Sequence, residues 1–306
     1  MLASLGYILV TVMLPMGAII GLGYVLQRAL RLDLSTLTRF SMYALIPCLV
    51  FTRVYDASFS WVELGRVFLY AIAVMAALYA IGLVASRLLG LSRPKRLAFG
   101  NSLMFFNSGN YGLPMVDLAF AGDPVAVTGQ LMIMLIQNLV GNSFGVFQAG
   151  RGGAGWRQAL RRTLTLPTLW VMATVFVIKA VGLVLPKGVL APMRYISDGF
   201  VGFALFTLGA SLSGVAMRPG LRDALVSSAI KLAAAPALGL LIVSAFGFQG
   251  ILAQSLVLGV STPSAVNTAI IAREMGNEPD YAARLVFVST LLSPVSIAVV
   301  LMLVGR

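Results

Sequence analysis

The chain has 306 residues, of which 59% are hydrophobic and only 10% are charged, and its formal net charge is +12. A soluble globular domain has about 25% charged residues, so this composition excludes a soluble protein and predicts an all-α integral membrane protein. The absence of histidine and the single cysteine, Cys48, exclude histidine-based catalysis and an internal disulfide.

Ten apolar stretches are long enough to predict membrane-spanning helices, which need about 20 residues each. They cover residues 5–26, 35–54, 65–88, 98–121, 125–148, 166–185, 191–215, 224–246, 250–272 and 282–304. The longest connection, Arg151–Arg162, is basic and rich in glycine. We therefore expect a first five-helix unit over 1–149, a cytoplasmic linker over 150–165 and a second five-helix unit over 166–306.

The fourth and ninth of these stretches are interrupted in the middle, at Asn107–Pro114 and at Ser261–Asn267. Proline removes a backbone donor and glycine permits non-helical backbone, so both segments interrupt a helix. A membrane tolerates such backbone only where it is buried in protein or lines a wet cavity. A pair of breaks at corresponding positions of two halves is the best sequence pointer to a transporter's binding site. The alternative for each break alone is a proline kink satisfied by neighbouring helices.

The two halves of the chain match one another at a nearly constant offset. Asn101 matches Gln254 at an offset of 153 residues, and Leu14-Pro15 matches Leu166-Pro167 at 152. Because each half has five spans, the second half enters the membrane upside down relative to the first. The sequence therefore predicts two inverted five-helix repeats.

The basic residues test this topology, because cytoplasmic loops are enriched in Lys and Arg. One face of the predicted arrangement carries Arg28, Arg31, Arg39, Arg87, Arg93, Lys95, Arg96, Arg151, Arg157, Arg161, Arg162, Arg218, Arg222, Arg273 and Arg284. The other face carries only Arg53, Arg66, Lys187, Arg194 and Arg306. The first face is therefore predicted to be cytoplasmic, with both termini outside. The same bias accounts for the net charge, so we expect no nucleic-acid partner.

Polar residues in and near the breaks are the candidate substrate-binding residues. Half-helix N-termini present N–H groups and a positive dipole end, which favour an anion. The candidates in the breaks are Asn107, Ser108, Gly109, Asn110, Tyr111, Pro114, Ser261, Thr262, Pro263 and Asn267. The fifth span adds Gln137, Asn138 and Asn142, of which Asn138 and Asn142 are the stronger candidates. These polar groups could line a site or join helices to one another.

Four of the charged residues within the predicted spans need individual interpretation. Lys231 could hold a substrate carboxylate or titrate during transport, or it could snorkel to the interface, which we expect for Lys179. Asp117 and Asp198 could each be a proton or cation site, or could pair with an arginine. Arg194, four residues before Asp198, is one such partner.

At Asn107–Pro114 the sequence resembles the first crossover motif of the auxin efflux carrier family, which includes bacterial malate permease-like proteins. Ser261–Asn267 and the following residues through Pro294 resemble that family's second crossover and last span. The resemblance implies the fold of the bile-acid/sodium symporters. In that fold spans one, two, six and seven form a scaffold, and the other six form a moving transport domain.

The resemblance also implies an elevator-type secondary transporter of small organic anions, such as malate or auxin-like acids, in the bacterial cytoplasmic membrane. The chain departs from the plant carriers because it has no long central loop and has Asn-Ser-Gly-Asn at 107–110. We expect the lipid bilayer and an organic anion as partners, a homodimer through scaffold helices, and no cofactor or metal. Coupling to a proton or sodium gradient stays open. The alternatives are a channel or a sensor on the same fold and, as a separate class of function, an intramembrane Ser/Lys hydrolase built on Lys231.

Overall fold

The computed structural model describes residues 5–148, 161, 164–215, 221–274 and 278–305, and this part of the chain is helical without a β-strand. The helices are α1 (Leu5–Ile8), α2 (Leu14–Leu30), α3 (Leu34–Phe40), α4 (Ile46–Asp56), α5 (Trp61–Leu88), α6 (Arg93–Met104), α7 (Leu113–Ala119), α8 (Pro124–Gln148), α10 (Pro167–Ala180), α11 (Lys187–Asp198), α12 (Phe200–Leu212), α13 (Leu221–Ala245), α14 (Gly250–Val260), α15 (Asn267–Glu274) and α16 (Pro279–Val304). Three π-helical segments complete the set: η1 (Leu9–Met13), η2 (Ser41–Leu45) and η3 (Ser108–Gly112).

Seven helical stretches in the described residues are long and apolar enough to cross a membrane. They are Leu5–Leu30, Leu34–Asp56, Val62–Leu88, Pro124–Gly141, Lys187–Leu212, Leu221–Ala245 and Pro279–Val304. The other three predicted spans are the two that are broken and the sixth, where α10 has only 14 residues. The predicted linker lies almost entirely outside the described residues. A multi-pass helical membrane protein is therefore confirmed, whereas ten spans in inverted repeats stay a prediction.

Each π-helical segment ends two residues before a proline, at Pro15, Pro47 and Pro114. Proline has no N–H, and its ring clashes with the carbonyl four residues earlier. The residue before each proline therefore donates to the carbonyl five residues back, as Leu113 does to Ser108. The third of these widened turns lies inside the first break of the apolar pattern.

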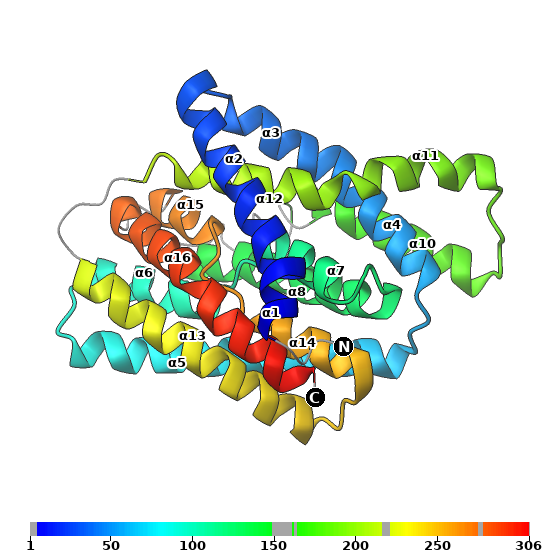
Figure 1. Ribbon diagram of the computed structural model, residues 1–306. Coiled ribbons are helices and arrows are strands. Elements are labelled where there is room, and N and C mark those ends of the chain that lie inside the picture. The colour runs from blue at the N-terminus through cyan, green and yellow to red at the C-terminus, as the bar shows by residue number, and fades with distance from the viewer. Residues whose placement is uncertain (1–4, 149–160, 162–163, 216–220, 275–277, 306) are drawn as a thin grey trace.

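The helices pack into two groups (Figure 1). The α2 group contains α2, α3, α4, α10, α11 and α12, in which α2 packs on α12 and α4 packs on α10 and α11. The α13 group contains α5, α6, α8, α13, α14, α15 and α16, in which α5 packs on α6 and α13 packs on α16. The segments η3 and α7 lie between the groups, since they contact α8 and α14 on one side and α12 on the other.

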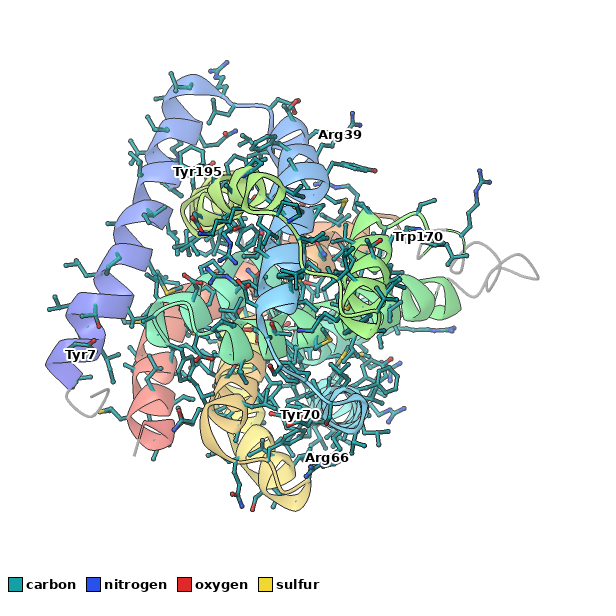
Figure 2. All side chains as sticks on the ribbon, turned by 90° about the vertical axis from the view of Figure 1, so that its right-hand side faces the viewer. Tyr7, Arg39, Arg66, Tyr70, Trp170 and Tyr195 are labelled. Carbon is teal, nitrogen blue, oxygen red and sulfur yellow. The ribbon has the colours of Figure 1, made fainter. Side chains whose placement is uncertain are left out.

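Large apolar and aromatic side chains cover the outside of the molecule. Figure 2 shows Tyr7, Trp170 and Tyr195 on this surface, where 37%, 61% and 82% of their respective areas are exposed. A soluble monomer rarely exposes such continuous apolar surface. These helix faces are suited to contact with lipid.

The α2 and α12 helices cross at two glycines. A Cβ atom at Gly209 would overlap the carbonyl oxygen of Ile20, and a Cβ atom at Gly23 would overlap that of Phe206. Only a residue without a side chain lets the two backbones approach so closely. This crossing fixes the first predicted span against the seventh.

Gly209→Ala is expected to destabilise the protein, whereas Gly202→Ala on the same helix is expected to stabilise it. The added methyl at Gly209 must push two backbones apart, at a cost of about 1–3 kcal/mol. At Gly202 nothing lies within 4 Å of the new atom, so alanine gains its higher helix propensity, about 0.5–1 kcal/mol. The midpoint of thermal unfolding in detergent measures the change in stability of each variant. Equal midpoints for the two variants would contradict this account of the crossing.

Candidate functional site

The two interrupted segments meet in the interior of the molecule. After α6 ends at Met104 the chain is non-helical through Phe105–Asn107, and after α14 ends at Val260 it is non-helical through Ser261–Val266. Phe106 and Ser264 form an isolated antiparallel bridge. The two non-helical segments around this bridge are called the crossover below.

Backbone hydrogen bonds join the two halves of the crossover. The Asn107 N–H donates to the Pro263 carbonyl at 2.7 Å, and the Ala265 N–H donates to the Phe105 carbonyl at 3.1 Å. The Ser264 hydroxyl adds a third link by donating to the Ser102 carbonyl at 2.7 Å. Groups that a broken helix leaves unpaired are thus satisfied by the other broken helix, as burial in an apolar medium requires.

Two glutamines of α8 hold the first half of the crossover. Gln137 accepts a hydrogen bond from the Phe106 N–H at 3.1 Å and donates to the Phe106 carbonyl at 2.6 Å. It also donates to the Ser108 hydroxyl oxygen at 3.2 Å. About two helical turns earlier on α8, Gln130 donates to the Ser108 carbonyl at 2.9 Å. The Gln137 side-chain amide therefore pairs with the Phe106 backbone as a neighbouring β-strand would.

The sequence favours Asn138 and Asn142 over Gln137 as substrate-binding residues, and that ranking stays a prediction. In the structure the bonds to Phe106 and Ser108 come from Gln137 and Gln130, whereas Asn138 is half-buried. The side chain of Asn142 lies outside the described residues. Gln130 was missed altogether. Its spacing of seven residues from Gln137 places both amides on one helix face, and this was the signal that could have identified it.

Lys231 of α13 lies at the back of the crossover with no exposed surface. Its ammonium group donates to the Leu103 carbonyl, at the end of α6, and stands 5.0 Å from the centre of the Phe106 ring. Snorkelling of Lys231 is therefore wrong, because its side-chain nitrogen stays inside and bonds the end of the first half-helix.

The predicted residues of the first break lie together but differ in burial. Asn107, Ser108 and Tyr111 are buried, whereas Gly109 and Asn110 are half-buried. The Tyr111 hydroxyl accepts a hydrogen bond from Ser293 at 3.0 Å. Pro114 is buried at the start of α7. The partly exposed residues Gly109 and Asn110 are thus the part of the first break that a ligand could reach.

In the second break, the polar side chains of Ser261 and Thr262 are already engaged in hydrogen bonds to the preceding helix. The hydroxyls of Ser261 and Thr262 donate to the Val257 and Gly259 carbonyls at 2.6 and 3.0 Å, which cap α14. Asn267 begins α15 and is exposed. Ser261 and Thr262 therefore have a structural role in this conformation.

One side-chain donor in the crossover has no partner among the described residues. Asn107 is 5% exposed, and its side-chain nitrogen Nδ2 makes no hydrogen bond there. Leaving a buried donor unpaired costs about 1–3 kcal/mol. An acceptor such as a carboxylate or a water would relieve this cost, which makes the Asn107 amide a chemically suitable ligand contact.

Two pockets lie along the boundary between the helix groups. One, of about 220 Å³, lies between Met16 and Ile20 of α2, Tyr111 of η3, and Phe287 and Pro294 of α16.

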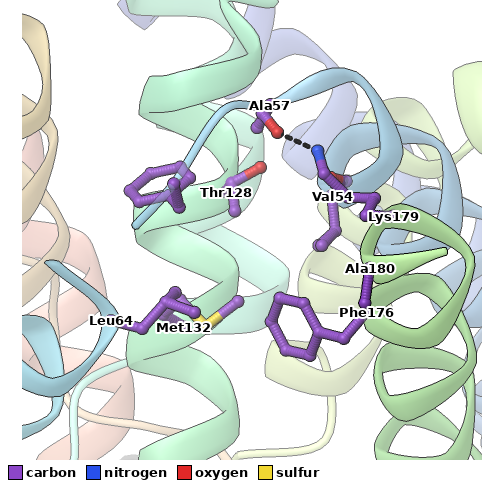
Figure 3. Close-up of a pocket in the computed structure, with 9 residues that line it drawn as sticks. Val54, Ala57, Leu64, Thr128, Met132, Phe176, Lys179 and Ala180 are labelled. Atoms are coloured by element: carbon purple, nitrogen blue, oxygen red, sulfur yellow. Dashed lines mark hydrogen bonds between the residues drawn. The ribbon is translucent and has the colours of Figure 1, made fainter. Parts of the chain in front are cut away.

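The other pocket, of about 170 Å³, lies between the ends of α4 and α10 and the α8 residues Thr128 and Met132 (Figure 3). Lys179 borders it and donates to the Val54 and Tyr55 carbonyls, at 3.1 Å each, and to that of Ala57. Its ammonium thus caps α4, which is a more specific role than the predicted snorkelling.

The intramembrane acids also differ from expectation in their partners. Arg194 donates to Asp56 of α4 at 2.8 Å rather than to Asp198. The i, i+4 spacing fails here because α11 packs against α4, which brings Asp56 within reach. Asp117 pairs with Arg53 at 3.2 Å, so its pairing with an arginine is confirmed.

Comparisons with known proteins agree with these features. A family model described as membrane transport protein matches residues 156–301. A protein named as an uncharacterized transporter, from Methanothermobacter thermautotrophicus, is 26% identical over 268 residues, which are 87% of each chain. These similarities support the resemblance found in the sequence, and they point to a membrane transporter and not to an enzyme, so the hydrolase alternative is set aside.

Proposed function

We propose that this chain is a secondary transporter of small organic anions such as carboxylates, in line with its similarity to a membrane transport protein family and to a protein named as a transporter. The observation that carries the proposal is the crossover, where two broken helices satisfy each other's backbone around the Phe106–Ser264 bridge. Broken helices that cross near the middle of a membrane form the substrate sites of many secondary transporters.

The packing of the helices supports inverted repeats and an elevator movement. If the first five predicted spans correspond to the last five, the contact between spans one and seven (α2 and α12) corresponds to that between six and two (α10 and α4). Both contacts occur. In the α13 group, α5 against α8 likewise corresponds to α13 against α16, and both pairs occur. The α2 group would then be the scaffold and the α13 group the moving transport domain.

The two pockets support alternating access. The pocket beside Tyr111 is built from the first, fourth, seventh and tenth predicted spans, and the pocket beside Lys179 from the helices of the second, third, fifth and sixth, which are α4, α5, α8 and α10. Exchange of the repeats relates three of the four spans in each set. Two such pockets on the boundary between scaffold and transport domain are suited to open to opposite faces of a membrane in turn.

The positions of charged helix ends support the proposed orientation in the cytoplasmic membrane. The C-terminal end of α5 and the N-terminal ends of α6, α13 and α16 gather at the left of Figure 1. These ends carry Arg87, Arg93, Arg222 and Arg284. A basic face of this kind is the cytoplasmic one in bacterial membrane proteins, and both chain termini would then be outside.

The anion-binding residues are proposed to be the half-buried end of the first break and the unpaired amide beside it, which are Gly109, Asn110 and Asn107. Tyr111, Ser108 and Pro114 shape the turn, and Pro263 holds it from the second half. Ser261, Thr262 and Asn267 would reach the anion only in another conformation. Lys231 holds the end of α6 from behind without contact with the anion.

Uptake of labelled malate and of labelled indole-3-acetate into proteoliposomes tests the proposal. Asn110→Ala is expected to lower the initial rate for the transported anion at least about tenfold, because it removes a polar contact that the site gives to the carboxylate. Gln249→Ala, which removes an exposed amide before α14, is the matched control and should keep the parent rate. Unchanged transport by Asn110→Ala would show that the first break is not the site.

A channel or a transport-inactive sensor on the same fold is the second candidate. Saturation of the rate and acceleration of efflux by substrate on the opposite side distinguish a carrier from a channel. A sensor would bind malate or indole-3-acetate but would transport neither of them.

A further inference from the structure

Arg53, in the last turn of α4, joins the two helix groups. Its guanidinium donates to the Asp117 carboxylate of α7 at 3.2 Å and to the Gly122 carbonyl, after α7, at 3.0 Å. The Thr128 hydroxyl of α8 donates back to the Arg53 carbonyl at 3.1 Å. The side chains of Arg53 and Asp117 are each 22% exposed. The C-terminal end of α4 is thus tied by polar contacts to the elements that carry the crossover.

A second ion pair on the same turn of α4 behaves differently. Asp56 accepts from Arg194 of α11 at 2.8 Å, and α4 and α11 both belong to the α2 group. A displacement of the α13 group, together with α7, along the α2 group would break the Arg53–Asp117 pair and leave the Asp56–Arg194 pair intact. The two pairs therefore form a natural comparison.

The charges that face Asp117 are few. Asp198, at the end of α11, lies near enough for the two carboxylates to repel each other. Asp123, in the loop after α7, is engaged by the Val125 and Ala126 N–H groups at 2.9 and 3.0 Å. The elements packed against α7, which are η1, η3, α8, α12 and α14, contain no Asp, Glu, Lys or Arg, and Tyr111 is their one titratable residue. Arg53 is thus the cation that balances Asp117 in the described structure.

We propose that the Arg53–Asp117 pair is a latch between scaffold and transport domain, and that protonation of Asp117 opens it. This inference rests on the proposed elevator movement. The Asp117 carboxylate takes a proton from the aqueous phase and becomes a neutral carboxyl group, while Arg53 keeps its charge and, as the helix groups separate, exchanges its bonds to Asp117 and Gly122 for bonds to solvent. Without the proton, separation would leave a carboxylate without its counter-charge in a poorly solvated interface, which is strongly unfavourable. The proton returns to the same side when the latch closes, so the latch sets the rate of the movement and does not drive accumulation.

Hydrogen exchange of the full-length chain in proteoliposomes tests the latch without a substrate. Arg53→Gln is expected to speed amide exchange of the segment 118–126 about fivefold to tenfold at pH 7, because the segment loses its tie to α4. Asp117→Asn should have the same effect. Arg194→Gln breaks the pair inside the α2 group and should match the parent. As pH falls from 7 towards about 4, where carboxyl groups protonate, the parent should approach Asp117→Asn.

Equal exchange in the parent and Arg53→Gln at pH 7 would overturn the latch. Equal loosening by Arg53→Gln and Arg194→Gln would also overturn it, since α4 would then simply be destabilised. In the transport assay with labelled malate and indole-3-acetate, the parent rate should depend on external pH, and Asp117→Asn should lose that dependence while Asp123→Asn keeps it. Asp123→Asn is a matched control because asparagine caps a helix as well as aspartate does. Absence of transport of both anions with exchange as expected refutes the proposed function alone. Transport with an unchanged pH dependence in Asp117→Asn refutes the latch alone.

Discussion

Replacement of Gln137 by leucine is expected to unfold the crossover and abolish transport. The buried Phe106 N–H has the Gln137 side chain as its partner, whereas the Phe106 carbonyl accepts from both Gln137 and the Ser108 N–H, the latter at 2.8 Å. Leucine fills the same space but leaves the Phe106 N–H unpaired and removes one of the two bonds to the carbonyl. A buried backbone group left unpaired costs about 1–3 kcal/mol. This is a sizeable part of the stability of an ordinary domain. The thermal unfolding midpoint and the uptake rate should both fall steeply.

Asn138→Leu is the matched control for this prediction. It makes nearly the same chemical change one residue further along α8, at a half-buried position that is turned away from Phe106 by the helical rotation. Its midpoint should stay within a few degrees of the parent. Gln137→Glu should lie between the two, because it keeps an acceptor for the Phe106 N–H and loses the donor to the carbonyl. If Asn138→Leu proves the more damaging change, Gln137 does not close the crossover as described.

Lys231→Met is expected to reduce the maximal transport rate at least about tenfold while the apparent affinity for substrate changes about twofold or less. Lys231 is fully enclosed, and its ammonium bonds the Leu103 carbonyl at the end of α6. Methionine matches the shape of the aliphatic stem and leaves that carbonyl unpaired, at a cost of about 1–3 kcal/mol. The first half-helix then loses its normal geometry, which lowers the maximal rate. The substrate contacts made elsewhere persist, so the apparent affinity changes little. Initial rates over a range of concentrations separate the two parameters.

Lys187→Met removes an exposed lysine at the start of α11 and should leave both parameters unchanged. Lys231→Arg should not rescue transport, because the larger planar guanidinium does not fit an enclosed ammonium site. A large rise in the concentration needed for half-maximal rate, with the maximal rate kept, would instead identify Lys231 as a direct partner of the anion.

Much of the fold could be predicted because the composition of a short stretch of sequence determines whether that stretch is buried in a membrane. A long apolar run predicts a spanning helix from its own composition, and a proline or glycine marks where such a helix is interrupted, as at Pro114 and Pro263. The meeting of the two breaks was suggested by their matched positions in the two halves. The bridge between Phe106 and Ser264 connects them directly.

The partners within the site could not be predicted in the same way. Whether Gln137 or Asn138 faces the crossover depends on the rotation of α8, and a rotation of about 100° per residue separates them. The apolar pattern around α8 is too uniform to fix that rotation, since the helix is apolar on most of its faces. Ion pairs across helices have no sequence signal at all, and Arg194 accordingly finds Asp56 rather than its neighbour in the chain.

The bridge between Phe106 and Ser264 also bears on how the protein is made. During synthesis α6 emerges long before α14, and a 12-residue helix rises only about 18 Å, too little for a bilayer core of about 30 Å. The carbonyl of Phe105 and the N–H of Asn107 receive their partners only when Ala265 and Pro263 have been translated. The first broken helix must therefore wait, shielded by the insertion machinery or by water at the membrane surface, until most of the chain exists. Biogenesis should thus be sensitive to any truncation before Pro263, even though every helix of the first half is complete by then.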